Sequence, residues 1–235
     1  MKNIIIASTS TIHGSTYLEY LLETLETFFA NAKTILFIPY ARPGGISHDA
    51  YTAIAQKGLS KINKTVKSIH EFENPIEAIE QAEGIFVGGG NTFVLTYQLY
   101  KNNLITPIQN AVKSGTPYLG TSAGSNICGL TIKTTNDMPI VYPPSFNALA
   151  LVPFNINPHY LDPDPTSKHM GETRETRINE FHHYNTPPVI GLREGSWLHV
   201  NESSIILNGP LTARIFEHNK TPYEVNPGTQ LNHLN

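Results

Sequence analysis

The first half of the chain alternates short apolar runs with amphipathic segments, and this alternation restricts the fold more than any other feature. Each apolar run has the length of a buried strand, and most of the segments that follow have apolar residues at helical spacing. We expect strands at residues 2–8, 34–39, 65–69, 84–87 and 116–120, and helices at 15–29, 49–61, 75–82, 92–100 and 106–114. Strands separated by helices pair in parallel, with helices on both faces of the sheet. The pattern therefore predicts an α/β fold with a doubly wound, mostly parallel sheet.

The alternation loosens after residue 130. Residues 134–164 are rich in proline and asparagine, with one strand candidate at 154–156. A helix is expected at 173–183 and a further strand at 189–192. Short apolar runs separated by turns are typical of antiparallel strands, and they predict a short C-terminal antiparallel extension from the segments 197–200, 204–207 and 212–216. Because no internal repeat or linker interrupts the chain, we expect a single domain over residues 1–235.

Composition excludes several classes of protein. A chain of 235 residues, 40% of them hydrophobic, is long enough to bury a full core. No apolar run reaches the roughly 18 residues of a membrane helix, and a net charge of −3 gives no general attraction to nucleic acid. The single cysteine, Cys128, fits a reducing compartment. We therefore expect a cytoplasmic protein with no metal, cofactor, membrane or nucleic-acid partner.

A candidate nucleophile stands where the last strand of the parallel set meets the next helix. The sequence Gly120-Thr121-Ser122-Ala123-Gly124 has the Gly-x-Ser-x-Gly pattern of a nucleophile elbow. Glycines two residues before and after the serine allow the strand and helix backbones to pass closely. The pattern also occurs in ordinary turns, so the assignment of Ser122 depends on the rest of the chain.

Three consecutive glycines, Gly88-Gly89-Gly90, follow the fourth predicted strand. They lack the spacing of a dinucleotide fingerprint or a P-loop, and taken alone they could equally form a flexible turn. At the end of a strand they expose backbone N–H groups that no side chain shields. The N–H groups of Gly90 and Ala123 together would form a two-donor oxyanion hole.

A serine nucleophile needs a neighbouring base, and His159 is the best candidate. It lies in a loop directly after a predicted strand, whereas His199 and His218 lie within strand-like runs. Two acids could orient it, Asp137 in the loop before it and Glu194 after a later strand. Spacing does not choose between them, because a triad is defined by geometry rather than by chain order.

The segment at residues 171–177, with the sequence GETRETR, contains two arginines. Its simplest interpretation is the start of a helix, in which acidic residues of the first turn complement the helix dipole. Alternatively, an arginine in this segment binds a carboxylate of the substrate through paired hydrogen bonds.

Taken together, these segments resemble the aspartyl dipeptidase (peptidase E) family of serine peptidases. The motifs occur in order along nearly the whole chain: GGGNT at 88–92, SAG at 122–124, TTNDMPI at 134–140, INPH at 156–159 and GETRE at 171–175. The resemblance implies a fold similar to class I glutamine amidotransferases, with a serine in place of the cysteine at the elbow. It also implies metal-independent hydrolysis of dipeptides that carry an N-terminal aspartate.

The resemblance also implies roles for individual residues. Ser122 is then the nucleophile and His159 the base, and both Asp137 and Glu194 stand at positions proposed for the acid. The only expected partner is a small dipeptide substrate, and the chain is expected to be a monomer or a homodimer.

Substrate contacts follow from the same resemblance. Arg174, with Asn91, would hold the aspartyl carboxylate of the dipeptide. The proline-rich residues 137–164 and the segment 171–177 could close over the substrate and limit its length.

Two other functions remain open from the sequence. A cyanophycinase-like hydrolase could use the same elbow on β-aspartyl linkages or on larger substrates. In a different class, a non-catalytic module could bind a small anion at the glycine turn. Cys128 is a weaker alternative as nucleophile, because its position in the helix after the elbow predicts burial in the core.

Overall fold

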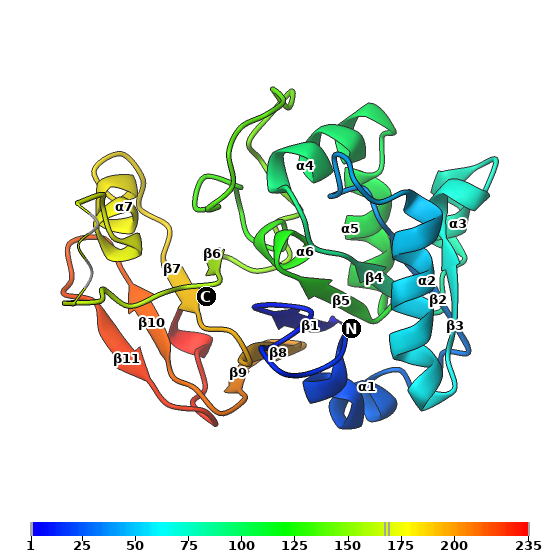
Figure 1. The fold of residues 1–235 in the computed structure, drawn as a ribbon, viewed down its shortest axis with the longest axis horizontal. Coiled ribbons are helices and arrows are strands. Elements are labelled where there is room, and N and C mark those ends of the chain that lie inside the picture. Colours follow the sequence, from blue (N-terminus) through cyan, green and yellow to red (C-terminus); the bar gives the residue numbers. More distant parts are fainter. Residues whose placement is uncertain (1, 167, 169, 235) are drawn as a thin grey trace.

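The computed structural model describes residues 2–166, 168 and 170–234 and arranges their strands in two sheets (Figure 1). The larger sheet has seven strands in the order β3-β2-β4-β5-β1-β8-β9. Their bounds are β1 Asn3–Ala7, β2 Thr34–Ile38, β3 Thr65–Ser68, β4 Ile85–Val87, β5 Tyr118–Thr121, β8 Trp197–Asn201 and β9 Ser204–Asn208. The first five pair in parallel, as the sequence predicts.

Strand register brings the carboxyl ends of three central strands to one edge of this sheet. Ala7 pairs with Thr121, and Val87 pairs with Gly120. The segments that follow β1, β4 and β5 therefore begin side by side. This edge receives the predicted elbow and the glycine turn.

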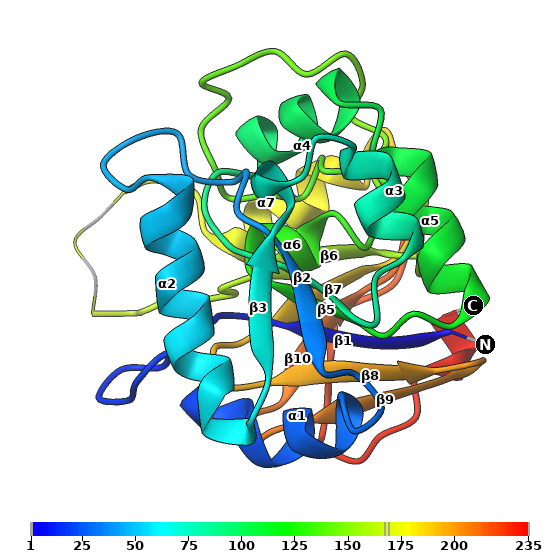
Figure 2. The ribbon, with the colours of Figure 1, turned by 90° about the vertical axis from the view of Figure 1, so that its right-hand side faces the viewer.

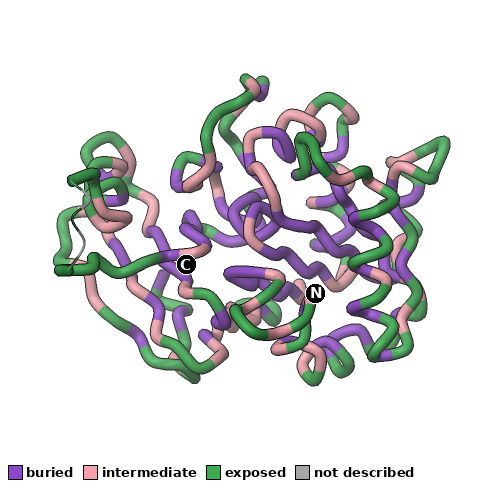
Figure 3. Tube along the Cα trace, in the orientation of Figure 1, coloured by how far each residue is buried: buried purple, intermediate pink, exposed green. Residues whose placement is uncertain are grey.

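Helices cover both faces of the parallel strands, and Figure 2 shows α2 on one side and α3 and α5 on the other. Alternate residues of β1 confirm the arrangement: Ile5 packs in one apolar cluster with α1 and α2, and Ile4 and Ile6 pack in the other with α3, α4 and α5. Figure 3 shows the buried residues of these central strands in purple. The helices are α1 Leu22–Phe28, α2 His48–Leu59, α3 Pro75–Glu80, α4 Thr92–Lys101, α5 Ile105–Ser114, α6 Ala123–Asn126 and α7 Arg174–Phe181. Short 3-10 turns lie at Glu19–Leu21, Ser60–Ile62, Ile69–Glu71 and Asn232–Leu234.

The helix expected from residue 15 begins later. Leu18 has a left-handed backbone (φ 59°), and its N–H donates to Ser10 O at 2.7 Å. The Glu19 carboxylate accepts from the N–H of Thr16 at 2.6 Å and thereby ends the preceding loop. The apolar spacing of residues 17–21 reflects burial of a loop and a 3-10 turn, which periodicity alone does not distinguish from an α-helix.

The second sheet has four strands in the order β11-β10-β7-β6 (Figure 1). Its strands are β6 Asn155–Pro158, β7 Val189–Leu192, β10 Ala213–Phe216 and β11 Tyr223–Val225. The C-terminal strands pair antiparallel as the sequence predicts, but they join two sheets: β8 and β9 pair with each other and extend the main sheet beside β1, whereas β10 pairs with β7. The local pattern of a strand does not reveal which open sheet edge it will join.

Buried side chains of both sheets, such as Ile6 and Ile190, belong to one apolar cluster. A single domain has one shared hydrophobic core, so this cluster is consistent with the single domain expected from the sequence. The assignment of one domain stays a prediction. Within the described residues, no helix is both long and apolar enough to span a membrane.

Candidate active site

Ser122 occupies a strained turn between β5 and α6. Its backbone has φ 55° and ψ −112°, a conformation that residues other than glycine rarely adopt and that costs about 1–3 kcal/mol. Its side chain is partly exposed, whereas Thr121 and Ala123 on either side are buried. A strained and accessible serine at the end of a central strand has the geometry of a nucleophile elbow.

The two elbow glycines are required by close backbone contacts. A Cβ atom on Gly120 would lie 2.4 Å from the carbonyl oxygen of Gly124, and one on Gly124 would lie 2.2 Å from that of Val87. Any side chain at either position would separate α6 from β4 and β5.

His159 lies directly after β6 and faces the elbow. Its Nε2 lies 2.8 Å from Ser122 Oγ. Its backbone is also left-handed (φ 54°), and its N–H donates to Ser8 Oγ, which itself donates to the carbonyl of Leu192. Ser8 thus ties the backbone of His159 to the ends of β1 and β7.

Glu194, not Asp137, contacts the imidazole. Oε1 of Glu194 lies 2.6 Å from His159 Nδ1. When Nδ1 donates to this carboxylate, Nε2 is left to accept the proton of Ser122. The Asp137 carboxylate instead accepts from the N–H of Thr92 at 2.7 Å, at the start of α4.

The glycine turn after β4 lies against the elbow. A Cβ atom on Gly89 would stand 2.9 Å from Ser122 Cβ. Gly90 has φ +143°, and a side chain there would meet the carbonyl of Ala41. Among the described residues, none accepts a hydrogen bond from the N–H of Gly90 or Ala123, the two donors predicted for an oxyanion hole.

Comparison with known proteins identifies the family. The sequence model of Peptidase family S51 matches residues 4–208. The chain belongs to peptidase family S51. It is 46% identical over 232 residues to "Peptidase E" of Streptomyces coelicolor, a match that covers 99% of this chain and 94% of the relative. It is 47% identical over 236 residues to "Probable alpha-aspartyl dipeptidase" of Drosophila melanogaster, with 99% and 97% covered.

Solved structures show the same fold at low sequence identity. A putative peptidase E protein from Listeria monocytogenes EGD-e matches with a TM-score of 0.68 at 22% identity, covering 90% of this chain and all of that one. A peptidase from an acI-B1 actinobacterium matches with a TM-score of 0.73 at 16% identity, covering 98% and 96%. The α/β fold predicted from the sequence is confirmed.

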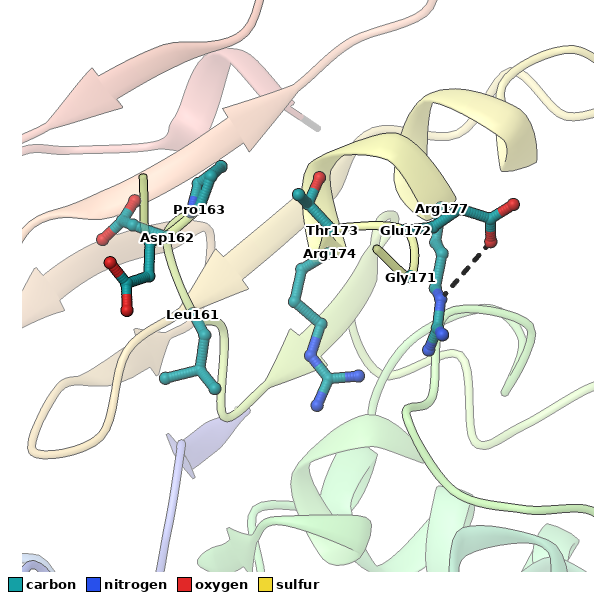
Figure 4. A pocket seen from close by; sticks show the side chains of 9 residues that line it. Leu161, Asp162, Pro163, Gly171, Glu172, Thr173, Arg174 and Arg177 are labelled. Atoms are coloured by element: carbon teal, nitrogen blue, oxygen red, sulfur yellow. Dashed lines mark ion pairs between the residues drawn. The ribbon is translucent and has the colours of Figure 1, made fainter. Parts of the chain in front are cut away.

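In this S51 peptidase, Arg174 is the first residue of α7 and lines a cavity of about 390 Å³ (Figure 4). Its guanidinium points into the same space as the side chain of Leu161, which lies two residues after His159. Partial burial lowers the pKa of Arg174, as does neighbouring Arg177 to a smaller extent, whereas the Asp137 carboxylate raises it. Arg177 pairs with Glu172 at 3.7 Å, but Arg174 forms no ion pair among the described residues. Its guanidinium is therefore available to an anionic ligand.

The side chain of Asn91 is already engaged. Its Oδ1 accepts from the N–H of Val94 and caps α4, and its Nδ2 donates to the carbonyl of Met138 at 2.9 Å. Asn91 thereby fastens the loop around Met138 to the start of α4. Its contact with substrate, which the family resemblance implies, stays a prediction.

A chain of ion pairs, which was not predicted from the sequence, links the elements that carry His159, Glu194 and Arg174. Arg193 binds Asp162 at 2.6 Å and Glu224 at 2.9 Å, and Arg214 binds Glu224 at 3.4 Å and Glu175 at 3.0 Å. The guanidinium of Arg193 lowers the pKa of Asp162. The paired residues of this ion-pair chain lie ten to about forty residues apart in the sequence, so no local motif could reveal them.

A second serine–histidine–aspartate chain lies away from the elbow. Ser68 Oγ is 2.6 Å from His70 Nδ1, and His70 Nε2 is 2.8 Å from Asp49. Ser68 is fully buried, and its hydroxyl caps the 3-10 turn that ends at Glu71. Without access to substrate this chain is structural.

Cys128, the alternative nucleophile, is fully buried, and burial raises the pKa of its thiol. No group of three or more histidine, cysteine or acidic side chains in the described part of the chain could hold a metal ion.

Proposed function

We propose that this protein is a serine-type dipeptidase that cleaves Asp-Xaa dipeptides through an acyl-enzyme on Ser122. The observation that carries the proposal is the continuous chain from Ser122 Oγ through His159 to Glu194, with contacts of 2.8 and 2.6 Å. Such a chain at a strained elbow is the arrangement that activates a serine hydroxyl. The names of the two relatives, peptidase E and alpha-aspartyl dipeptidase, support the substrate class.

The chemistry follows from the positions of these groups. His159 Nε2 takes the Ser122 proton as Oγ attacks the aspartyl carbonyl, and Glu194 stabilises the resulting imidazolium. The N–H groups of Gly90 and Ala123 stabilise the oxyanion. When the C–N bond breaks, the imidazolium gives its proton to the leaving amine. Water, deprotonated by His159, then hydrolyses the ester and restores the serine.

Arg174 supplies the preference for an acidic first residue. Its guanidinium is partly buried, forms no ion pair with any described residue and lies at the cavity beside Leu161, where it can bind the aspartyl carboxylate. Arg174→Met should lower kcat/KM for α-Asp-Leu by about 10²-fold, mainly through KM, since a buried charged contact is lost. Arg177→Met, which removes a guanidinium already paired with Glu172, is the matched control and should change kcat/KM by less than about threefold. Equal losses in the two variants would contradict this role of Arg174.

The substrate class is tested by comparing α-Asp-Leu, β-Asp-Leu, Ala-Leu and Asp-Ala-Leu with the purified protein. We expect α-Asp-Leu to be cleaved about 10²-fold faster than the others, because the carboxylate contact and the closed site both select it. Preference for β-Asp-Leu would instead support a cyanophycinase-like hydrolase. A fluorophosphonate probe should label Ser122; absence of both labelling and turnover would support the anion-binding module.

The setting is also a proposal. We infer a monomer or homodimer that acts in the cytoplasm on a small dipeptide and binds neither nucleic acid nor membranes. The single cysteine and the net charge of −3 support it.

A further inference from the structure

The orientation of the peptide group between Gly89 and Gly90 decides whether the Gly90 N–H can serve as an oxyanion donor. Glycine lacks a Cβ on both sides of this bond, so the local chain gives little preference between the two directions of the peptide plane. In the reversed direction the Gly89 carbonyl would take the place of the N–H donor. Some contact outside the turn must hold the plane.

Tyr51, on α2, makes that contact. Its hydroxyl donates to the Gly89 carbonyl at 3.1 Å. The tyrosine is only 1% exposed, and a Cβ atom on Gly88 would lie 2.6 Å from its hydroxyl, so the ring packs directly under the turn. Phe37 fixes the ring edge-on, with 5.0 Å between centroids. A hydroxyl held this firmly has little freedom to follow a rotating peptide.

The Val87–Gly88 and Gly90–Asn91 peptide groups are held by bonds to other backbone groups. The N–H of Gly88 donates to Ile38 O at 3.2 Å, and that of Asn91 donates to Ala41 O at 2.7 Å. Among the described residues, the Gly89–Gly90 peptide receives a hydrogen bond only from Tyr51. In a trans peptide the C=O and N–H point in opposite directions, so fixing the Gly89 carbonyl toward α2 turns the Gly90 N–H away from α2.

We propose that Tyr51 is a positioning residue for catalysis, which holds the Gly90 N–H in the direction that stabilises the oxyanion. This inference rests on the proposed function, because it assumes acyl transfer at Ser122. Tyr51 acts through its hydrogen bond to the Gly89 carbonyl and not on the reacting atoms themselves. Its effect should therefore appear in the transition state and not in substrate binding.

The test is Tyr51→Phe, which removes the hydroxyl and keeps the buried ring. We expect kcat for α-Asp-Leu to fall about 10- to 100-fold with KM within about threefold, less than the loss on removing a donor outright. In a Ser122→Ala background, the added Tyr51→Phe change should leave the Kd for α-Asp-Leu unchanged.

Tyr118→Phe is the matched control. Tyr118 is also fully buried, and its hydroxyl donates to the Gly124 carbonyl at 2.8 Å, but that same peptide group is held independently by the bond from its own N–H, that of Ser125, to Ser122 O. Both variants should lower the melting temperature to a similar extent, and only Tyr51→Phe should lower kcat more than about twofold. If the wild-type protein cleaves α-Asp-Leu and Tyr51→Phe retains its kcat, the inference is wrong and the proposed function stands. If the wild-type protein cleaves no dipeptide, the proposed function itself fails.

Discussion

Ser122→Ala is expected to lower kcat/KM for α-Asp-Leu by about 10⁴-fold or more, because the acyl-enzyme cannot form without the Oγ atom. Alanine has the same Cβ as serine and places no new atom against Gly89. The folded structure should therefore persist, with a melting temperature close to that of the wild type. Peptide cleavage by chromatography and thermal unfolding by circular dichroism measure the two effects separately.

Cys128→Ala is the control for Ser122→Ala, because Cys128 is the only thiol in the chain and lies in the segment directly after α6. Its Sγ contacts the carbonyl of Gly124 from a fully buried position. The substitution should lower stability by about 1 kcal/mol and change kcat by less than about threefold. Turnover that survives Ser122→Ala and disappears in folded Cys128→Ala would reverse the assignment of the nucleophile.

The elbow and the glycine turn could be predicted from the sequence because their geometry is local. Gly120 and Gly124 are needed because each lies against backbone atoms a few residues away or on an adjacent strand. The five-residue Gly-x-Ser-x-Gly pattern therefore indicates this close packing directly. The alternation of strands and helices similarly determines the parallel part of the sheet. These predictions depend on short-range physics, and the structure confirms the fold that they imply.

The acid partner of His159 could not be predicted, because it depends on the pairing of two distant strands. In the second sheet β6 and β7 are parallel, with Pro158 opposite Leu192. His159 follows Pro158 directly, and Glu194 lies two residues beyond Leu192, so this register alone brings the carboxylate to the imidazole. No local pattern in the sequence predicts which strand β6 will pair with. For the same reason the sequence does not predict which of the two sheets β8, β9 and β10 join.

Glu194→Gln is expected to lower kcat by about 10³-fold, because the amide is nearly isosteric but cannot stabilise the imidazolium that forms on His159. The expected loss is smaller than for a buried triad acid, since the Glu194 side chain is 48% exposed and water can partly replace its charge. Asp137→Asn is the matched comparison: its amide oxygen can still accept the hydrogen bond from Thr92 N–H, and it does not touch the imidazole. We expect it to lower kcat by less than about tenfold. Because the two substitutions remove the same charge, a greater loss of kcat in Asp137→Asn would show that contact with His159 is not what makes an acid catalytic here.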